Sequence, residues 1–191
     1  MMIFPIPAVL RQLAGATTVA VALSLSGPAF AQVDAQQSSI VATVRQMHVP
    51  LDGKFGHFDA QVVFDPARPA SGSARVSVDM SSFDLGESSL NEQVQGKAWF
   101  DVAEYPSARF VSSAIVPAGG GKYSVTGRLT IRGKTQDVIV PVSVTEQAHS
   151  RVLDGSLPIR RHRFGIGQGV GVDTRGIADD VVIKFHLVVA K

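Results

Sequence analysis

The sequence predicts an all-β fold of short antiparallel strands with one short helical insertion. Two observations predict it: apolar and polar residues alternate along most of the chain, and turn-forming Gly, Pro and Asp residues recur between the alternating segments. The clearest alternation places Tyr123, Val125, Gly127, Leu129 and Ile131 on one face, with Ser124, Thr126, Arg128 and Thr130 on the other. A period of two with one polar face is typical of an antiparallel sheet that is solvated on one side.

Residues 1–31 are predicted to lie outside this fold, as a secretory signal peptide. Arg11 precedes an apolar run over residues 13–25, and Ala29–Ala31 has the small-residue pattern of a cleavage site. The run is short for a membrane span, and an uncleaved anchor is the alternative. We expect residues 32–191 to form one domain, soluble in the periplasm because no cysteine follows the leader to carry a lipid.

Charge and cysteine content narrow the function classes. Removal of the leader takes away one arginine and no acidic residue, so the formal charge of +2 falls to +1. A near-neutral chain does not indicate nucleic acid or an anionic membrane as a partner. The chain has no cysteine, so its stability must come from packing and from closure of the sheet.

The first part of the domain contains three predicted strands, at residues 38–49, 55–64 and 74–80. Asp52-Gly53 is a strong hairpin signal and predicts the first turn within residues 51–54. Each of the three predicted strands has one face of alternating, mainly apolar residues. These faces consist of Ile40, Ala42, Val44 and Gln46, then Phe58, Ala60, Val62 and Phe64, then Ala74, Val76, Val78 and Met80. Helical spacing of Leu90, Val94 and Ala98 then predicts one short helix over residues 89–97.

After a proline corner at Tyr105-Pro106, five more strands are predicted, at residues 108–116, 123–131, 136–144, 151–161 and 181–190. Pro141 cannot donate a ladder hydrogen bond, which indicates a bulge or a locally unpaired edge. Eight short antiparallel strands are typical of a sandwich or a barrel. A closed eight-stranded barrel has room inside for side chains or for one slender ligand.

No catalytic or metal-binding group is predicted, and no cofactor. The five histidines are scattered without ligand-like spacing, no G-x-S-x-G motif occurs, and no cysteine nucleophile exists. Gly165, Gly167, Gly169 and Gly171 are spaced like part of a dinucleotide loop, but no helix is predicted after them. We interpret them as a flexible crossover at the mouth of a barrel.

Two clusters near the ends of the predicted strands have both a structural and a functional interpretation. The basic run 160–163 (Arg-Arg-His-Arg) is interpreted as a solvated turn, with an arginine at the rim that pairs with a phosphate or a polar lipid head as the alternative. Trp99 and Phe100 are interpreted as a plug at one end, where Trp99 can also contact a ligand.

Several motifs, in order, resemble the YceI-like polyisoprenoid-binding family. They are W-F-D at residues 99–101, Y-P at 105–106 followed by Phe110 and Ser112, and G-x-L-T-I-x-G-x-T at 127–135, with 53–55, 64–66 and 163–167 resembling its first hairpin and last crossover. The resemblance implies an eight-stranded antiparallel lipocalin-like barrel. It also implies a carrier that binds a polyisoprenoid, an isoprenoid-quinone lipid or a related amphiphile without covalent chemistry.

Small residues in the inward rows, such as Ala42, Ala60, Ala74 and Gly127, favour a channel over a solid core. The candidate ligand-binding residues are therefore Phe58, Val62, Phe64, Val76, Val78, Trp99, Phe110, Val125, Leu129, Val140, Phe164 and Phe185. The chain departs from the family pattern at Gln46, where a histidine is frequent, at Asn91, where an aspartate is usual, and near Gly171, where a tryptophan is usual.

The motifs W-F-D and Gln46-Met47 are more similar to the subgroup joined to, or encoded beside, cytochrome b561-type membrane proteins. This similarity implies a cytochrome b561-type membrane partner.

Two other classes of protein stay open. An eight-stranded outer-membrane barrel would need an apolar outer band, where this chain has Arg75, Arg128 and Lys184. A lipocalin-like enzyme would need a catalytic group that the sequence does not display.

Overall fold

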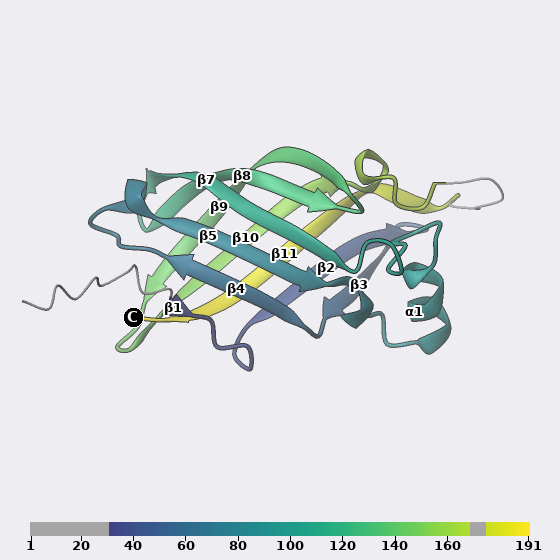
Figure 1. Cartoon of the computed structure of the whole chain (residues 1–191), viewed down its shortest axis with the longest axis horizontal. Coiled ribbons are helices and arrows are strands. Elements are labelled where there is room, and N and C mark those ends of the chain that lie inside the picture. The colour runs from purple at the N-terminus through teal and green to yellow at the C-terminus, as the bar shows by residue number, and fades with distance from the viewer. Residues whose placement is uncertain (1–30, 169–174) are drawn as a thin grey trace, which may run out of the picture.

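The computed structural model describes residues 31–168 and 175–191, and it shows one antiparallel sheet that curls into a lipocalin-like barrel (Figure 1). Eleven strands form this sheet in the order β1-β4-β5-β7-β8-β9-β10-β11-β2-β3-β6. Every neighbouring pair is antiparallel. The predicted all-β barrel with one helical insertion is therefore confirmed.

The strands are β1 (Ala31–Gln32), β2 (Ser39–Gln46), β3 (Val49–Phe55), β4 (Phe58–Val63), β5 (Ser73–Asp79), β6 (Phe83–Asp84), β7 (Ser107–Gly119), β8 (Lys122–Ile131), β9 (Lys134–Glu146), β10 (Ser150–Arg160) and β11 (Ile177–Ala190). The α-helix α1 spans Ser88–Gln95, and three 3-10 turns lie at Pro69–Ser71 (η1), Met80–Ser82 (η2) and Arg161–Phe164 (η3). The eight predicted strands correspond to β2, β4, β5 and β7 to β11, and the extra strands are β3 and the two-residue β1 and β6.

The first hairpin turn lies elsewhere than predicted. Met47 and His48 form it, with φ angles of 48° and 70°, as in the tight turns that suit the twist of paired strands. Asp52 and Gly53 lie inside β3 instead, paired with Thr43 and Ala42. Gly53 is needed there because the Phe83 ring packs on it: a Cβ at Gly53 would lie 2.1 Å from that ring. The Asp52-Gly53 turn prediction is therefore wrong.

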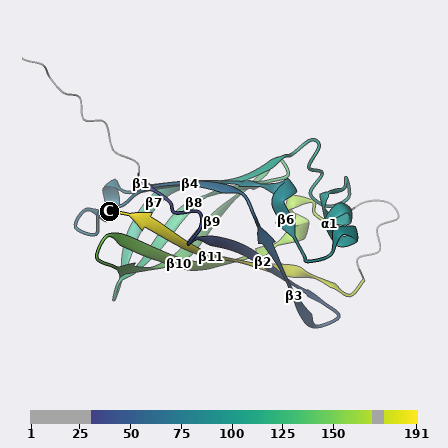
Figure 2. The same cartoon turned by 90° about the horizontal axis from the view of Figure 1, so that it is seen from below.

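The seam of the barrel is closed by the residues around β1. Backbone pairing joins β1 to β4, with Ala31 opposite Val62. Val33 forms a bridge with Val189 of β11, and the amide of Asp34 donates to the carbonyl of Val188 at 2.8 Å. The start of the described chain thus lies between β4 and β11, close to the C-terminus (Figure 2).

The ladder between β9 and β10 ends at Pro141. These strands pair from Arg151–Glu146 to Gly155–Val142, and no register pair follows, although β10 stays paired with β11 as far as Arg160–Asp180. A proline cannot supply the next ladder donor. The locally unpaired edge predicted from Pro141 is confirmed.

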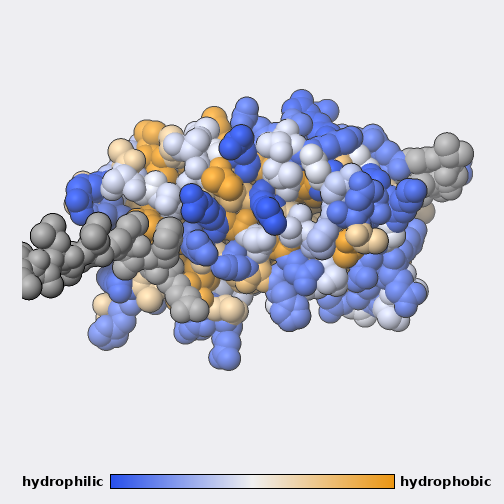
Figure 3. Space-filling view, viewed as in Figure 1, coloured by the Kyte–Doolittle hydropathy of each residue, from blue (hydrophilic) through white to orange (hydrophobic). Residues whose placement is uncertain are grey.

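The short helix α1 lies across one end of the barrel, the end opposite the C-terminus (Figures 1 and 2). Its Asn91 ties it to the adjoining strand β6, because the amide of Leu85 donates to Asn91 Oδ1 at 2.8 Å and Asn91 Nδ2 donates to Asp84 Oδ1 at 2.8 Å. On the face drawn in Figure 3, polar side chains are mixed with small apolar patches.

Candidate ligand-binding cavity

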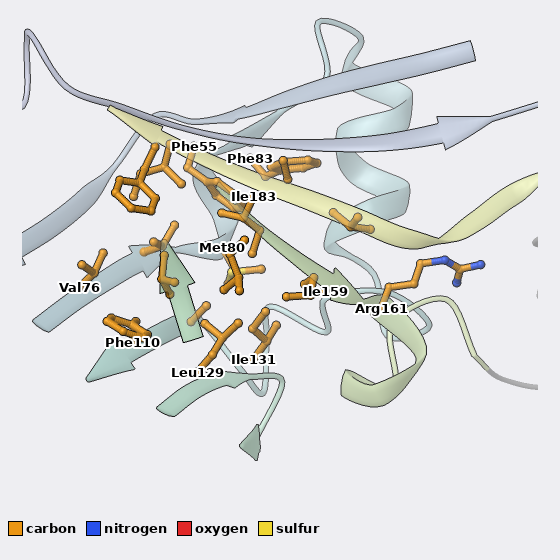
Figure 4. A pocket seen from close by; sticks show the side chains of 18 of the residues that line it. Phe55, Val76, Met80, Phe83, Phe110, Leu129, Ile131, Ile159, Arg161 and Ile183 are labelled. Atoms are coloured by element: carbon orange, nitrogen blue, oxygen red, sulfur yellow. The ribbon is translucent and has the colours of Figure 1, made fainter. Parts of the chain in front are cut away.

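The barrel encloses an apolar cavity of about 440 Å³ (Figure 4). Ten of the twelve predicted ligand-binding residues line it: Val62, Phe64, Val76, Val78, Trp99, Phe110, Val125, Leu129, Val140 and Phe185. Phe58 packs instead against the buried cluster around Ile40 and Leu187, and Phe164, only 1% exposed, belongs to the main core. Contact of these residues with a ligand stays a prediction.

Glycines in the sheet make room for aromatic rings of the chain itself. A Cβ at Gly127 would lie 2.6 Å from the Phe110 ring, and one at Gly155 would lie 2.3 Å from the Phe185 ring. Both rings line the cavity. The expectation that Gly127 leaves open channel space is therefore wrong. Of the three alanines expected in the inward rows, Ala42 and Ala74 line the cavity, whereas Ala60 belongs to the buried cluster with Ile40.

At one end of the cavity, which we call the closed end, the lining side chains are mainly apolar and are buried or half-buried: Val62, Phe64, Tyr123, Val142 and Leu187. Phe64 and Tyr123 meet edge to face, with ring centroids 4.9 Å apart. Val62 is 3% exposed and Leu187 is 5% exposed. Arg151 Nη1 also donates to the carbonyl of Phe64 at 3.1 Å, which holds β4 against β10.

The other end, which we call the mouth end, is where the lining becomes polar. Its lining includes Gln46 from β2, Gln93 from α1, Arg161 from η3 and Arg175 just before β11. Gln46, Gln93 and Arg175 are exposed, so the cavity reaches solvent among them. The remaining charged lining residue, Arg109, is exposed on β7. The sequence did not predict that α1 contributes Gln93, Leu90 and Val94 to the cavity lining, although the apolar spacing of the predicted helix was a signal for Leu90 and Val94.

Arg161 is the deepest charged group of the mouth end, and it is only 2% exposed. Its guanidinium donates to four carbonyls: Nε to Ala178 at 2.9 Å, Nη1 to Ile166 at 2.9 Å and Gly167 at 3.3 Å, and Nη2 to Ile177 at 3.1 Å. The guanidinium carbon lies 5.5 Å from the centre of the Trp99 ring. Figure 4 shows the side chain extending away from the apolar centre of the cavity.

This burial corrects the interpretation of the basic run as a solvated turn. Arg160 and Arg163 are exposed, and Arg160 lies 3.8 Å from Asp180, but Arg161 is inside the fold. Burial lowers the pKa of Arg161, and the nearby carboxylate of Asp179 opposes that shift. Its partners among the described residues are neutral carbonyls and an aromatic ring, a combination that fixes the crossover at the mouth end.

Trp99 and Phe100 both line the cavity where α1 meets the sheet, beside this arginine. Phe100 packs edge to face on Phe83, with ring centroids 5.3 Å apart. Next to them the buried Asp101 adopts a φ of 54° and lies 3.7 Å from Arg132, whose Nη2 donates to the carbonyl of Lys97 at 2.7 Å. These contacts hold the two aromatic residues at the mouth end.

In residues 31–168 and 175–191, no group of three or more His, Asp or Glu side chains could hold a metal ion. Within the same part of the chain, no helix is long and apolar enough to cross a membrane. Gly169 and Gly171, and the position near Gly171 where the family has a tryptophan, lie outside the described residues.

A curled antiparallel sheet around an apolar cavity, closed at one end and polar at the other, defines a lipocalin-like barrel. The family model described as a YceI-like domain matches residues 32–189. The chain therefore belongs to the YceI-like family.

Curated relatives carry the name UPF0312 protein. The chain is 31% identical to one from Vibrio cholerae and 33% identical to one from Yersinia pestis, over alignments that span about half the length of those relatives (48% and 51%) and of this chain (47% and 52%). It is 24% identical to one from Shewanella denitrificans, over 69% of this chain and 72% of that relative.

Solved structures share the fold. The crystal structure of Burkholderia cenocepacia BcnA is 54% identical, with a TM-score of 0.79 over 82% of this chain and 98% of that chain. A polyisoprenoid-binding domain from Saccharophagus degradans is 16% identical, with a TM-score of 0.68 over 84% of this chain and 97% of that chain.

Proposed function

We propose that this chain binds one long apolar molecule with a small polar head, an isoprenoid or an isoprenoid-quinone lipid, inside the barrel. The single observation that carries the proposal is the apolar cavity of about 440 Å³, with its polar residues gathered at one end. The name of the Saccharophagus degradans neighbour, a polyisoprenoid-binding domain, supports the ligand class. Binding is driven by removal of the apolar ligand from water, which contributes roughly 25 cal/mol per Å² of apolar surface buried.

The two ends of the cavity indicate how the ligand lies. The closed end offers the tail apolar side chains such as Val62 and Leu187. The mouth end offers the head the amides of Gln46 and Gln93 and the guanidinium of Arg161. A polar head buried without a hydrogen bond costs free energy, so the head belongs at the mouth end.

A binding role without covalent chemistry fits the side chains better than an enzyme. The nearest approach to a catalytic group is a row on the outer face: Ser39 of β2 lies opposite His186 of β11, which lies opposite Asp154 of β10. His186 Nδ1 is 2.7 Å from Asp154 Oδ1, and both side chains are about half exposed. The structure records no hydrogen bond from the Ser39 side chain to His186, so this row lacks the activated nucleophile that acyl transfer needs.

Export to the periplasm and cleavage before Gln32 are part of the proposal, supported by the pattern at Ala29–Ala31. Intact-mass measurement of protein released by osmotic shock without detergent tests both. A retained segment 1–31, or protein that needs detergent for release, would contradict them. A cytochrome b561-type partner stays a prediction of the resemblance.

Val78→Phe tests the cavity itself. Val78 lines the cavity from the middle of β5, between Phe58 and Ala108 on the neighbouring strands. A ring in open space should change the stability of delipidated protein by less than about 1 kcal/mol, whereas overpacking a solid core costs about 1–3 kcal/mol. The same ring should remove most of the lipid that co-purifies, measured by organic extraction and mass spectrometry.

Val116→Phe is the matched control, because Val116 is 53% exposed on the outer face of β7. It should retain as much lipid as the wild type. A Val78→Phe protein with unchanged lipid content would contradict the proposed binding site, and one that loses more than about 1 kcal/mol without ligand would indicate a solid core.

A further inference from the structure

The tip of the β2–β3 hairpin exposes two large apolar side chains to solvent. Met47 is 73% exposed, the highest value among the exposed large apolar residues of the described chain, and Val49 is 65% exposed, the same as Ile139. The turn between them holds both Met47 and His48 at positive φ, which presents their side chains at the very end of the hairpin. In Figure 2 this hairpin projects beyond the wall of the barrel.

The tip adjoins the mouth of the cavity. Gln46, the residue before Met47, lines the mouth end, and so does Arg175. The amide of Met47 donates to the carbonyl of Gly176 at 2.6 Å, which fixes the tip against the residue that follows Arg175. The exposed apolar side chains and the entrance to the cavity therefore form one continuous surface.

The tip segment itself is positive, although the predicted mature chain as a whole is nearly neutral. On the neighbouring strand β11, the bulge opposite Arg45 holds Asp179 and Asp180, which pair with His162 and Arg160. Residues 45–50 include Arg45 and no acidic residue, and Arg175 lies beside them. The nearest acid on the hairpin, Asp52, is set back along β3 and accepts from Thr43 Oγ1 at 2.6 Å. Apolar side chains with flanking cations are typical of segments that insert into the headgroup region of a bilayer.

We propose that the β2–β3 hairpin tip docks on the surface of a phospholipid bilayer, with Met47 and Val49 inserted and the mouth of the cavity facing the lipid. The apolar chain of the ligand then passes between bilayer and cavity without being exposed to water, which would oppose its transfer. This inference rests on the proposed function only for the identity of the ligand that is transferred. Docking on the bilayer depends on the side chains of the hairpin tip and not on which ligand the cavity binds.

The test compares a tip variant, Met47→Ser with Val49→Ser, with a control variant, Val116→Ser with Ile139→Ser. Val116 and Ile139 are 53% and 65% exposed, but they lie on β7 and β9 outside the tip. Delipidated proteins are incubated with phosphatidylcholine vesicles, with or without phosphatidylglycerol, loaded with ubiquinone as the probe. Transfer to protein is timed, and binding of protein to probe-free vesicles is measured by co-sedimentation.

The tip variant should take up ubiquinone from vesicles about tenfold more slowly, because it loses the insertion of two apolar side chains. It should co-sediment less, while the control variant matches the wild type in both measurements. Phosphatidylglycerol should increase wild-type co-sedimentation, and added salt should reverse that increase. Equal transfer and equal co-sedimentation of tip variant and wild type would overturn the inference.

Failure of the inference is distinguishable from failure of the proposed function. Ubiquinone delivered from detergent bypasses the bilayer, so wild type and tip variant should retain it equally. A wild type that retains neither ubiquinone nor a polyprenol delivered in this way contradicts the proposed function, and co-sedimentation with probe-free vesicles still decides whether the tip docks.

Discussion

The two ends of the cavity are built from different interactions. At the closed end, apolar side chains and the Phe64–Tyr123 ring contact seal the barrel, and the seam residue Val33 pairs with Val189 nearby. At the mouth end, a buried guanidinium binds the carbonyls of the crossover and of β11, and exposed polar side chains surround the opening. One end is therefore stabilised mainly by packing, and the other mainly by hydrogen bonds from the guanidinium groups of Arg161 and Arg132 to backbone carbonyls.

This difference explains how one small barrel has both an apolar interior and an entrance. Apolar packing excludes water and leaves nothing for a polar head to bind. Hydrogen bonds from a buried guanidinium to backbone carbonyls hold a loop in place, and the exposed amides of Gln46 and Gln93 stay beside the opening. Substitutions at the two ends should therefore have different effects, and the following three predictions test that contrast.

The largest expected effect is at the mouth end, from Arg161→Gln. A glutamine amide has two donor hydrogens and cannot satisfy four carbonyls, so buried acceptors are left without partners. We expect the free energy of unfolding to fall by about 3 kcal/mol, measured by urea denaturation. Arg163→Gln, at an exposed position of the same basic run, should change it by less than about 0.5 kcal/mol. Equal effects of the two substitutions would contradict the structural role of Arg161.

The next effect compares packing at the two ends. Phe64→Ala removes an aromatic ring contact and opens a void at the closed end, and it should cost about 2–3 kcal/mol in delipidated protein. Leu90→Ala on α1 truncates a half-buried residue beside the opening, where water can enter, and should cost about 1 kcal/mol. Thermal unfolding of both variants shows which substitution causes the larger loss of stability. A larger loss from Leu90→Ala would reverse the assignment of the sealed end.

The smallest effect concerns pH at the closed end. Hydrogen bonds from Lys191 and then Arg151 lower the pKa of Glu146 below its ordinary value of 4.5. A lowered carboxyl pKa stabilises the fold above the ordinary pKa, and this stabilisation is lost as the pH falls through the lowered value. Because Glu146 is 46% exposed, solvent screening limits the contribution to about 0.5 kcal/mol.

Glu146→Gln should therefore lose that amount near neutral pH and match the wild type at acidic pH, when both are unfolded with urea at a series of pH values. Other carboxyl groups titrate in the same range, so the difference between the two proteins is the quantity that reports on Glu146. A difference that stays constant across the series would show that the hydrogen bonds do not shift this pKa.

The strands and their inward faces could be predicted because alternation is a local property. Tyr123–Ile131 places its apolar residues inside as expected, and Pro141 lies where the β9–β10 ladder ends. The helix was predicted within two residues of its observed ends, since Leu90 and Val94 mark its buried side. Each of these features depends on residues that are near one another in the sequence.

The features that could not be predicted depend on partners far away in the sequence. Asp52-Gly53 has the composition of a turn, but Phe83 packs on Gly53 from a strand about 30 residues later, and Met47-His48 forms the turn without a glycine. Arg161 belongs to a basic run that is typical of a solvated surface. Its burial depends on carbonyls of the crossover and of β11, which no pattern around Arg161 indicates.

The seam has a consequence for when this chain can fold. Phe185 of β11 pairs with Ile40 of β2, and Val189 pairs with Val33, so the barrel cannot close until the last strand has been synthesised. Contacts between such distant segments make folding slow relative to chains with mostly local contacts. In a chain proposed to be exported, slow closure lengthens the time during which the polypeptide stays unfolded and able to pass through a secretion channel.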